Sequence, residues 1–340
     1  MSSPSQTTKR DLRQEVTDSI IAALEKGVAP WQKPWQSGAF EMPLNPTTGK
    51  SYRGGNAVHL MVVGMRNGYE DPRWLTYRQA SENGWQVRRG EKGTQIEFWQ
   101  FPDAESASHE TPKDTGDSRN DRLIYRVYTV FNARQIDGIP VHVARVRQEW
   151  EVAQAAESIL QHNGARIYHD QADRAFYDRG SDTIHLPPRS AFKSAGTYYG
   201  TALHEAAHAS GHPSRLNRET LNESYRFGDP AYAKEELRAE LASVFLIAER
   251  GIPHNPDSHA AYLSSWVNAL KQDKHEIFRA ARDAHRAADF LLALEHYKSI
   301  DQALAHINAL QTGIDTPTPP PPGQITQVAR RNNQGVEMQR

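Results

Sequence analysis

The sequence predicts a protein of two domains, each built from helices together with short strands. Three observations lead to this prediction. First, 340 residues are more than the roughly 100–150 residues of a common single domain. Second, helical periodicity and strand-like runs occur together in residues 11–140 and again in residues 147–311. Third, the stretch around 140–148, which follows IDGIP, separates the two sets of elements.

Composition narrows the classes of protein to which the chain can belong. Lys and Arg number 40 and Asp and Glu 41, so the formal net charge is −1. The overall charge of the protein therefore favours neither a polyanionic nor a polycationic partner. Cysteine is absent, which excludes disulfide frameworks, thiolate nucleophiles and iron–sulfur sites. No apolar run approaches the ~18–20 residues of a membrane span, and the N-terminus lacks the apolar core of a secretory signal. We therefore expect a soluble, cytoplasmic protein with no membrane partner.

The first predicted domain covers residues 11–140 and begins with a helix. Leu12, Val16, Ile20 and Leu24 recur every four positions, and Gly27 ends the run. A loop-rich segment with little periodicity follows over residues 28–56. Further elements are expected after it: helices near 56–68 and 76–84, then strands at 94–101 and 122–131 that are rich in aromatic and β-branched residues.

A polar stretch separates the two predicted strands. Residues 102–121 show no apolar pattern, whereas both flanking runs have the composition of strands. We interpret the stretch as a mobile loop inside a hairpin and not as a domain boundary.

The second predicted domain covers residues 147–311 and becomes strongly helical after residue 197. It is expected to contain a first helix at 147–162, short strands at 165–168, 174–178 and 182–186, and helices at 197–210, 230–250, 258–271, 273–297 and 300–311. Residues 1–10 and the Pro-rich tail 312–340 are expected to be disordered.

The segment TALHEAAHASG carries the strongest chemical signal in the chain. His204 and His208 are four residues apart, so on a helix both side chains project from one face and can bind one metal ion. Glu205 lies between them and is better placed to touch a water molecule than the ion, which makes it the candidate general base. The pattern also suits a helix surface on which two histidines and a glutamate merely alternate with alanines. However, the flanking residues Ala202, Leu203, Ala206 and Ala207 form an apolar frame that favours the metal site.

Two histidines leave a third protein ligand to be found. The run AYAKEELRAELASVF offers Glu236 and Glu240, spaced i and i+4 on a predicted helix whose apolar stripe lies beside them. Glu236 is favoured as the ligand, with Glu240 orienting a histidine N–H. Two alternatives stay open: Glu240 as ligand, and His212, which would need a tight turn after Gly211. The ion is expected to be Zn²⁺, and Mn²⁺ is also compatible with a site of two histidines and one carboxylate.

The N-terminal domain combines aromatic rings with positive charge. Five of the seven tryptophans lie in the first hundred residues, and residues 26–95 contain ten Lys and Arg against five Asp and Glu. This combination suits single-stranded nucleic acid, in which bases stack on rings and cations track phosphates, although tryptophans more often belong to a core. The candidate DNA-binding residues are Trp31, Lys33, Trp35, Tyr52, Arg53, Asn56, Trp74, Tyr77, Arg88, Arg89 and Lys92.

Many short motifs resemble one family in order and spacing. The segments APWQKPW, NPTTGKSYRGGN, WLTYRQA, GWQVRRGEKGTQI and VFNARQIDGIP resemble the N-terminal domain of ArdC/TraC-type antirestriction proteins of plasmids and phages. DTIHLPPRSAFKSAGTYYGTALHEAAHASGHPSRLNR and YAKEELRAELASVFL resemble the zincin-like metallopeptidase domain of the same proteins. The similarity runs through about residues 10–295.

The resemblance implies an α+β fold for both domains, with HExxH on the active-site helix of a zincin. It implies that the N-terminal domain binds single-stranded DNA and that the protein protects incoming DNA from host restriction. The EELRAE run also resembles the third-ligand helix of anthrax lethal factor, in which the first Glu of the pair binds zinc, and this supports Glu236.

Two functional interpretations follow. In the first, an antirestriction protein combines DNA binding with a zinc peptidase of unknown protein substrate, which would lie along an edge strand formed by DTIHL. In the alternative, a non-catalytic replication or conjugation accessory protein binds single-stranded DNA and keeps the metal for structure.

Overall fold

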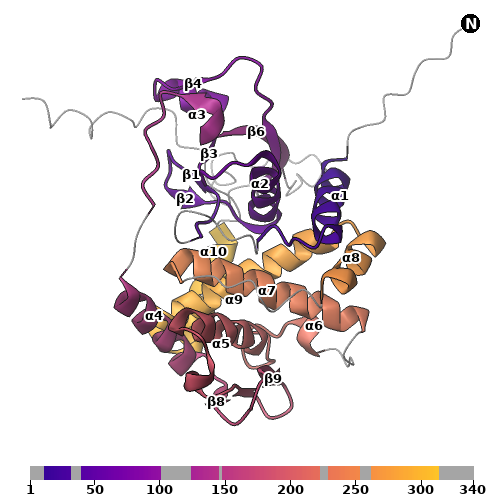
Figure 1. Ribbon diagram of the computed structural model, residues 1–340, viewed down its shortest axis with the longest axis vertical. Helices are drawn as coiled ribbons and strands as arrows, with labels where there is room; N and C mark the ends of the chain where they lie inside the picture. The colour runs from indigo at the N-terminus through magenta and orange to yellow at the C-terminus, as the bar shows by residue number, and fades with distance from the viewer. Residues whose placement is uncertain are drawn as a thin grey trace, which may run out of the picture.

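The computed structural model describes residues 11–31, 40–100, 124–144, 148–222, 229–252 and 262–313. Two halves lie one above the other along the longest axis (Figure 1). The upper half, from the N-terminal part of the chain, contains most of the strands, and the lower half is mainly helical. The α+β fold class and the two-domain organisation are confirmed.

The N-terminal half contains three helices and several short strands among its described residues. These are α1 (Leu12–Glu25), β1 (Leu44–Asn45), β2 (Lys50–Ser51), α2 (Gly54–Asn67), β3 (Trp74–Thr76), α3 (Tyr77–Glu82), β4 (Gln86–Val87), β5 (Thr94–Gln100), β6 (Ile124–Asn132) and β7 (Ile136–Asp137). The segment predicted to be loop-rich, 28–56, contains the small antiparallel pair β1–β2. Its two-residue strands are too short to show an alternating pattern in the sequence.

A three-stranded antiparallel sheet with the order β3-β6-β5 forms the centre of this half. Strands β5 and β6 pair as the hairpin that the sequence predicts, with Thr94 opposite Val130 and Gln100 opposite Ile124. Ile96 and Val130 lie on the face that packs against α2 and are buried. The predicted mobile loop 102–121 lies outside the described residues, as do the two predicted tails apart from positions 312 and 313 at the end of the last helix.

The C-terminal half is dominated by helices. Its elements are α4 (Glu149–His162), β8 (Arg166–Tyr168), β9 (Phe176–Asp178), β10 (Thr183–His185), α5 (Ala195–Ala209), α6 (Glu219–Asn222), α7 (Pro230–Arg250), α8 (Leu263–Gln272), α9 (Glu276–Tyr297) and α10 (Ile300–Gly313). Helix α7 packs against both α5 and α9. Asp229 caps its first turn, Pro230 occupies the first helical position, and Gly251 ends it in the left-handed conformation.

The three short strands form a sheet with the order β8-β10-β9. β10 pairs with β8 in parallel and with β9 in antiparallel orientation, so β10 is the central strand. The expectation that DTIHL forms an edge strand is therefore wrong, and β9 is the edge strand that comes next to α5. The order of the strands along the chain does not show this arrangement. β9 comes between β8 and β10 in the sequence, but β10 lies between the other two in the sheet.

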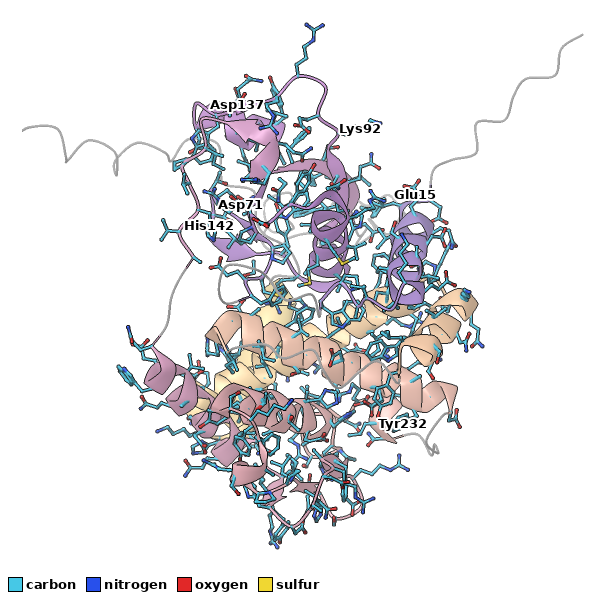
Figure 2. All side chains as sticks on the ribbon, in the orientation of Figure 1. Glu15, Asp71, Lys92, Asp137, His142 and Tyr232 are labelled. Carbon is cyan, nitrogen blue, oxygen red and sulfur yellow. The ribbon has the colours of Figure 1, made fainter. Side chains whose placement is uncertain are left out.

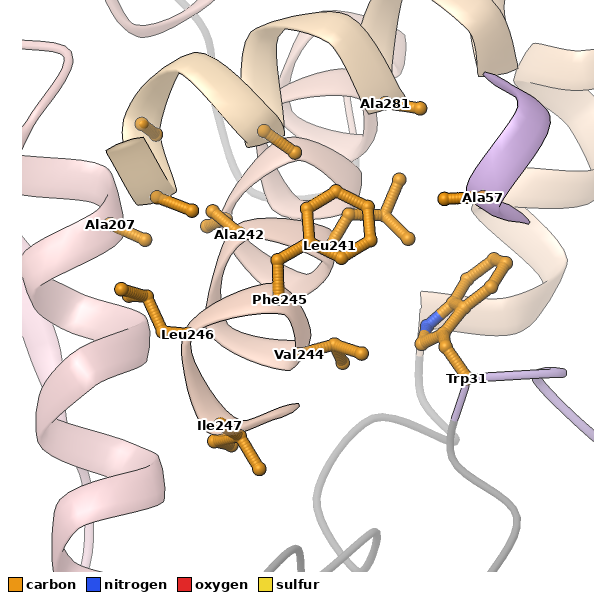
Figure 3. Close-up of a cluster of buried hydrophobic side chains, with 14 of the residues drawn as sticks. Trp31, Ala57, Ala207, Leu241, Ala242, Val244, Phe245, Leu246, Ile247 and Ala281 are labelled. Carbon is orange, nitrogen blue, oxygen red and sulfur yellow. The ribbon is translucent and has the colours of Figure 1, made fainter. Parts of the chain in front are cut away.

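One buried hydrophobic cluster runs through both halves of the molecule. Trp31 packs against Trp266 of α8 with ring centroids 6.0 Å apart. Figure 3 shows Trp31 and Ala57 of the N-terminal half beside Phe245 and Val244 of α7. The halves therefore share apolar surface, and we expect them to unfold together.

Polar contacts also join the two halves at this junction. The Arg53 guanidinium forms an ion pair with Asp289 of α9, and the Gly54 amide donates to Nδ1 of His285 at 3.1 Å. The Thr17 hydroxyl donates to the carbonyl of Lys274 at 2.8 Å. Each bond joins residues more than 200 positions apart in the chain, so the junction is fixed by tertiary contacts.

The buried imidazole of His285 makes the stability of this junction depend on pH. Burial, together with the positive charge of Arg53, lowers the pKa of His285 to about 3. The unfolded chain takes up a proton near pH 6.5 and the folded protein does not, so stability falls as pH drops from 6.5 toward 3. At pH 5 the loss should be about 2 kcal/mol, and His285→Gln, which cannot titrate, should lack it. Urea unfolding of both proteins at pH 7 and pH 5 tests this, and equal pH-dependent losses would contradict it.

Among the helices of the described ranges, none combines the length and apolarity that crossing a lipid bilayer requires.

Candidate metal centre

Helix α5 carries the two histidines of the HExxH motif. Its start is fixed by a capping box, in which the Ser194 hydroxyl accepts from the Thr197 amide at 3.2 Å. His204 and His208 follow three turns later, one turn apart, and their ring centroids are 4.9 Å apart. Both are buried, as is Glu205 between them. The sequence places small alanines around them, which lets α5 pack closely against α7.

Helix α7 brings a carboxylate to the two rings. Glu236 Oε2 lies 3.6 Å from Nε2 of His204, and its Oε1 lies 3.5 Å from Nε2 of His208. One donor atom from each of the three residues lies within 4.8 Å of the others. Two imidazole nitrogens and one carboxylate oxygen that converge in this way fit a four-coordinate zinc site with one open position. Nδ1 of His212, the other histidine considered as a ligand, instead lies 2.7 Å from the Ser214 hydroxyl.

The outer nitrogens of both rings face further carboxylates of α7. Nδ1 of His204 lies 3.7 Å from Glu240, the residue predicted to orient a histidine. Nδ1 of His208 lies 3.2 Å from Glu235, which the sequence analysis missed. These carboxylates favour the tautomer that leaves each Nε2 free of a proton and able to bind a metal ion.

Glu235 belongs to a buried polar network. The Arg218 guanidinium donates to it from Nε at 2.9 Å, and the Thr220 hydroxyl donates to it at 2.6 Å. Burial acts to raise the pKa of Glu235, but Arg218 and His208 outweigh it and lower the pKa to about 2. Glu235 is therefore an ionised, fixed partner for His208. The sequence does contain a signal for Glu235, because KEELRAE has two adjacent glutamates. If only one of them binds the metal ion, the other needs a different partner.

The site opens into a cavity of about 650 Å³. Glu205, the predicted base, lines it together with the three candidate ligands, and burial raises the pKa of Glu205. The edge strand β9 contributes Phe176, Tyr177 and Asp178 to the wall. Tyr232 of α7 and Tyr262, the residue that caps the start of α8, also line the cavity, and their hydroxyls are 3.2 Å apart. The cavity thus combines a buried carboxylate, three potential donors for a metal ion and the edge strand β9.

The charges of the metal-free site predict that metal binding releases protons. Burial opposes protonation of His208, but Glu236 and Glu235 outweigh it and raise its pKa to about 9. The pKa of His204 is likewise raised, by Glu236 and Glu240 against the effect of burial. Because both rings must lose a proton to bind a metal ion, binding at pH 7 should release roughly one to two protons. Calorimetric Zn²⁺ titrations in buffers of different ionisation enthalpy measure this number. The same heat in every buffer would contradict the prediction.

The structure places three of the predicted DNA-binding rings in the core. Trp31 is 0% exposed, and Tyr52 and Trp74 are each 2% exposed, so none offers a face on which a base could stack. The Tyr52 hydroxyl donates to the Trp74 carbonyl at 2.9 Å, which ties the two together. Their assignment as stacking residues is wrong, because residues distant in the sequence bury them.

Other predicted DNA-binding residues have structural partners or lie at the surface. Arg53 pairs with Asp289, and the Asn56 amide donates to the Glu97 carbonyl at 2.7 Å. Tyr77 is 53% exposed. Also exposed are Arg88, Arg89 and Lys92. Lys33 and Trp35 lie outside the described residues.

Comparisons with known proteins agree with this geometry. The profile of the N-terminal domain of anti-restriction factor ArdC matches residues 10–131, and that of the zincin-like metallopeptidases matches residues 154–283. The Mn(II)-bound crystal structure of the antirestriction protein ArdC from the R388 plasmid is 40% identical and superposes with a TM-score of 0.67 over 85% of this chain and 99% of that one. The chain belongs to the ArdC antirestriction family.

Other ArdC relatives extend the comparison. An uncharacterised protein y4eC of Sinorhizobium fredii is 37% identical and matches over 84% of this chain and 93% of its own length. A DNA primase TraC of Escherichia coli is 48% identical over 86% of this chain, and a second TraC from the same species is 44% identical over 84%. The chain spans only 28% and 20% of these two TraC proteins, so it corresponds to a part of each.

Proposed function

We propose that the protein binds single-stranded DNA through its N-terminal half, carries a metal-dependent peptidase centre in its C-terminal half, and protects incoming DNA from host restriction. The convergence of His204, His208 and Glu236 beside the buried Glu205 in one cavity carries the catalytic part. ArdC membership carries the antirestriction part. The protein would act in the cytoplasm on DNA carried by plasmids or during conjugation.

His204, His208 and Glu236 would hold the ion, which is Zn²⁺ or Mn²⁺. The donor set suits zinc, while a solved structure of the R388 relative is Mn(II)-bound. When bound, such an ion polarises a carbonyl group and makes a water molecule more acidic.

Glu205 would take the proton from the attacking water and pass it to the leaving amine. Its carboxylate is buried beside the histidines and lines the cavity, and burial raises its pKa, which favours holding a proton between the two steps. An extended peptide substrate would add a strand beside β9, the edge strand that lines the cavity. Glu240 and Glu235 would keep the two histidines in the ligating tautomer.

A second candidate function is non-catalytic. The donors come from both α5 and α7, so an ion would cross-link two core helices and stabilise the fold. The protein would then act only by binding single-stranded DNA, without cleaving any substrate, as a replication or conjugation accessory protein.

Transfer of plasmid DNA into restricting and non-restricting recipients separates the candidates. The peptidase proposal expects Glu205→Gln to lose protection in restricting recipients while the purified variant binds single-stranded DNA normally. Full protection by Glu205→Gln supports the non-catalytic candidate. Transfer into restricting recipients that is equally low with and without the wild-type protein would contradict any antirestriction role.

A further inference from the structure

We propose that single-stranded nucleic acid binds across the open face of β5 and β6, with bases against Tyr125 and phosphates at a cluster of cations beside the sheet. This inference rests on the proposed DNA binding and assigns it a surface. We call this surface the open sheet face and define it by Gln95, Glu97, Tyr125, Val127 and Thr129. None of these residues was singled out by the sequence.

The pairing register shows that these side chains share one side of the sheet. Gln95 lies opposite Thr129, and Glu97 lies opposite Val127. Residues of the other face, such as Ile96 and Val130, are buried against α2. On the open sheet face, in contrast, Tyr125 is 46% exposed and Val127 is 43% exposed. Thr129 is exposed as well, so an aromatic ring and two β-branched side chains meet solvent along one strand.

Exposed cations gather at one end of this face. The amide of Gln135 donates to the Lys92 carbonyl at 3.0 Å, and the Arg88 guanidinium donates to the Arg134 carbonyl. These bonds join the loop that precedes β5 to the turn that follows β6. The cation cluster consists of Arg88, Arg89, Lys92 and Arg134, all exposed. The nearby acids are Glu91 and Asp137, both in contact with Arg88, so positive charge is in excess.

The single acid of the open sheet face is neutralised within the protein. Glu97 accepts from the Arg13 guanidinium at 2.9 Å and 2.7 Å, and it is only 9% exposed. Its charge therefore repels an approaching phosphate little. The Tyr125 hydroxyl lies 3.5 Å from this carboxylate, which holds one end of a side chain that is 46% exposed.

The chemistry favours a single strand over a duplex or an apolar partner. Tyr125 and Thr129 are four residues apart, or roughly 14 Å along the strand, which gives room for a few unstacked bases. Stacking on an aromatic ring needs bases that are not paired, and the cation cluster matches phosphates. Figure 2 shows Lys92 of the cation cluster in the upper half of the molecule and Tyr232 of the metal cavity in the lower half. The lining of that cavity includes no residue of the open sheet face.

Fluorescence anisotropy with a labelled oligo-dT and the full-length protein tests the surface. Tyr125→Ala should weaken binding about 5- to 100-fold, whereas Tyr125→Phe should stay within about twofold of wild type. The matched control is Tyr168→Ala, which removes another exposed tyrosine, 43% exposed on β8. Binding by Tyr168→Ala should equal wild type. The double variant Lys92→Gln with Arg134→Gln should bind more weakly. The slope of log affinity against log salt concentration should also become shallower, by up to about the value expected for two lost phosphate contacts.

The outcomes separate this inference from the proposed function. Absence of wild-type binding to oligo-dT at low salt overturns the DNA-binding function itself. Wild-type binding that Tyr125→Ala leaves unchanged overturns only the open sheet face. A second measurement, photocrosslinking of wild-type protein to an oligonucleotide containing iodouridine, needs no variant to fold. Crosslinks within residues 88–97 or 124–134 support the assignment, and crosslinks confined to other segments overturn it.

Discussion

A Glu205→Gln variant is expected to bind one divalent ion as tightly as the wild-type protein and to hydrolyse peptides at least about 100-fold more slowly. The change removes the base but none of the three converging donors, and the amide keeps the size of the carboxylate. Mass spectrometry of a peptide library incubated with metal-loaded protein measures cleavage, and calorimetry measures the ion.

The control for this variant is Glu219→Gln. Glu219 is an exposed glutamate of α6, outside the cavity lining, so its replacement should alter neither measurement. Cleavage that persists in Glu205→Gln would contradict the assignment of Glu205 as base. Loss of the ion in this variant would show that Glu205 takes part in binding the metal.

The second large effect is expected at Arg218. Its guanidinium compensates the buried carboxylate of Glu235, donates to the Ala207 carbonyl at 2.9 Å, and is itself buried. Arg218→Ala would break this buried ion pair and leave Glu235 with only His208 and the Thr220 hydroxyl as partners, so the free energy of unfolding should fall by about 3–5 kcal/mol. Urea denaturation of the metal-free protein measures the loss.

Arg282→Ala provides the matched comparison. The Arg282 side chain is 66% exposed and pairs with Asp283 at 3.2 Å at the surface. Its removal should change stability by no more than about 0.5 kcal/mol. Similar losses in the two variants would mean that the buried network contributes no more than a surface ion pair does.

The metal-binding motif was predictable because its information is local. An HExxH spacing puts both histidines on one side of a helix, and the structure brings them together with the favoured Glu236. Which of two adjacent glutamates faces which ring depends on the rotation of α7 against α5. That rotation is set by packing across the core, and the partner that identifies Glu235, Arg218, lies 17 residues away.

The DNA-binding residues were harder to predict for a physical reason. Trp31 and Trp74 are of a residue type that forms stacking platforms, and only the structure shows that they are core residues. Trp31 packs against Trp266 of α8 and Trp74 against Tyr69, and both tryptophans are buried. Tyr125 was overlooked because it sits in a strand where apolar residues occupy both faces. The alternation becomes visible only once α2 is seen to cover one side.

Strand order was unpredictable in the same way. β8, β9 and β10 are each three residues long, and nothing in such short runs distinguishes an edge strand from a central one. The central place of β10 results from its parallel pairing with β8, a long-range contact.

Anomalous diffraction from crystals loaded with zinc tests the central claim most directly, because it locates the ion independently of any substrate. We expect one ion within about 2.0–2.2 Å of Nε2 of His204, Nε2 of His208 and a carboxylate oxygen of Glu236. An ion bound by Glu240 or His212 in place of Glu236, or no ion among these residues at saturating zinc, would contradict the account.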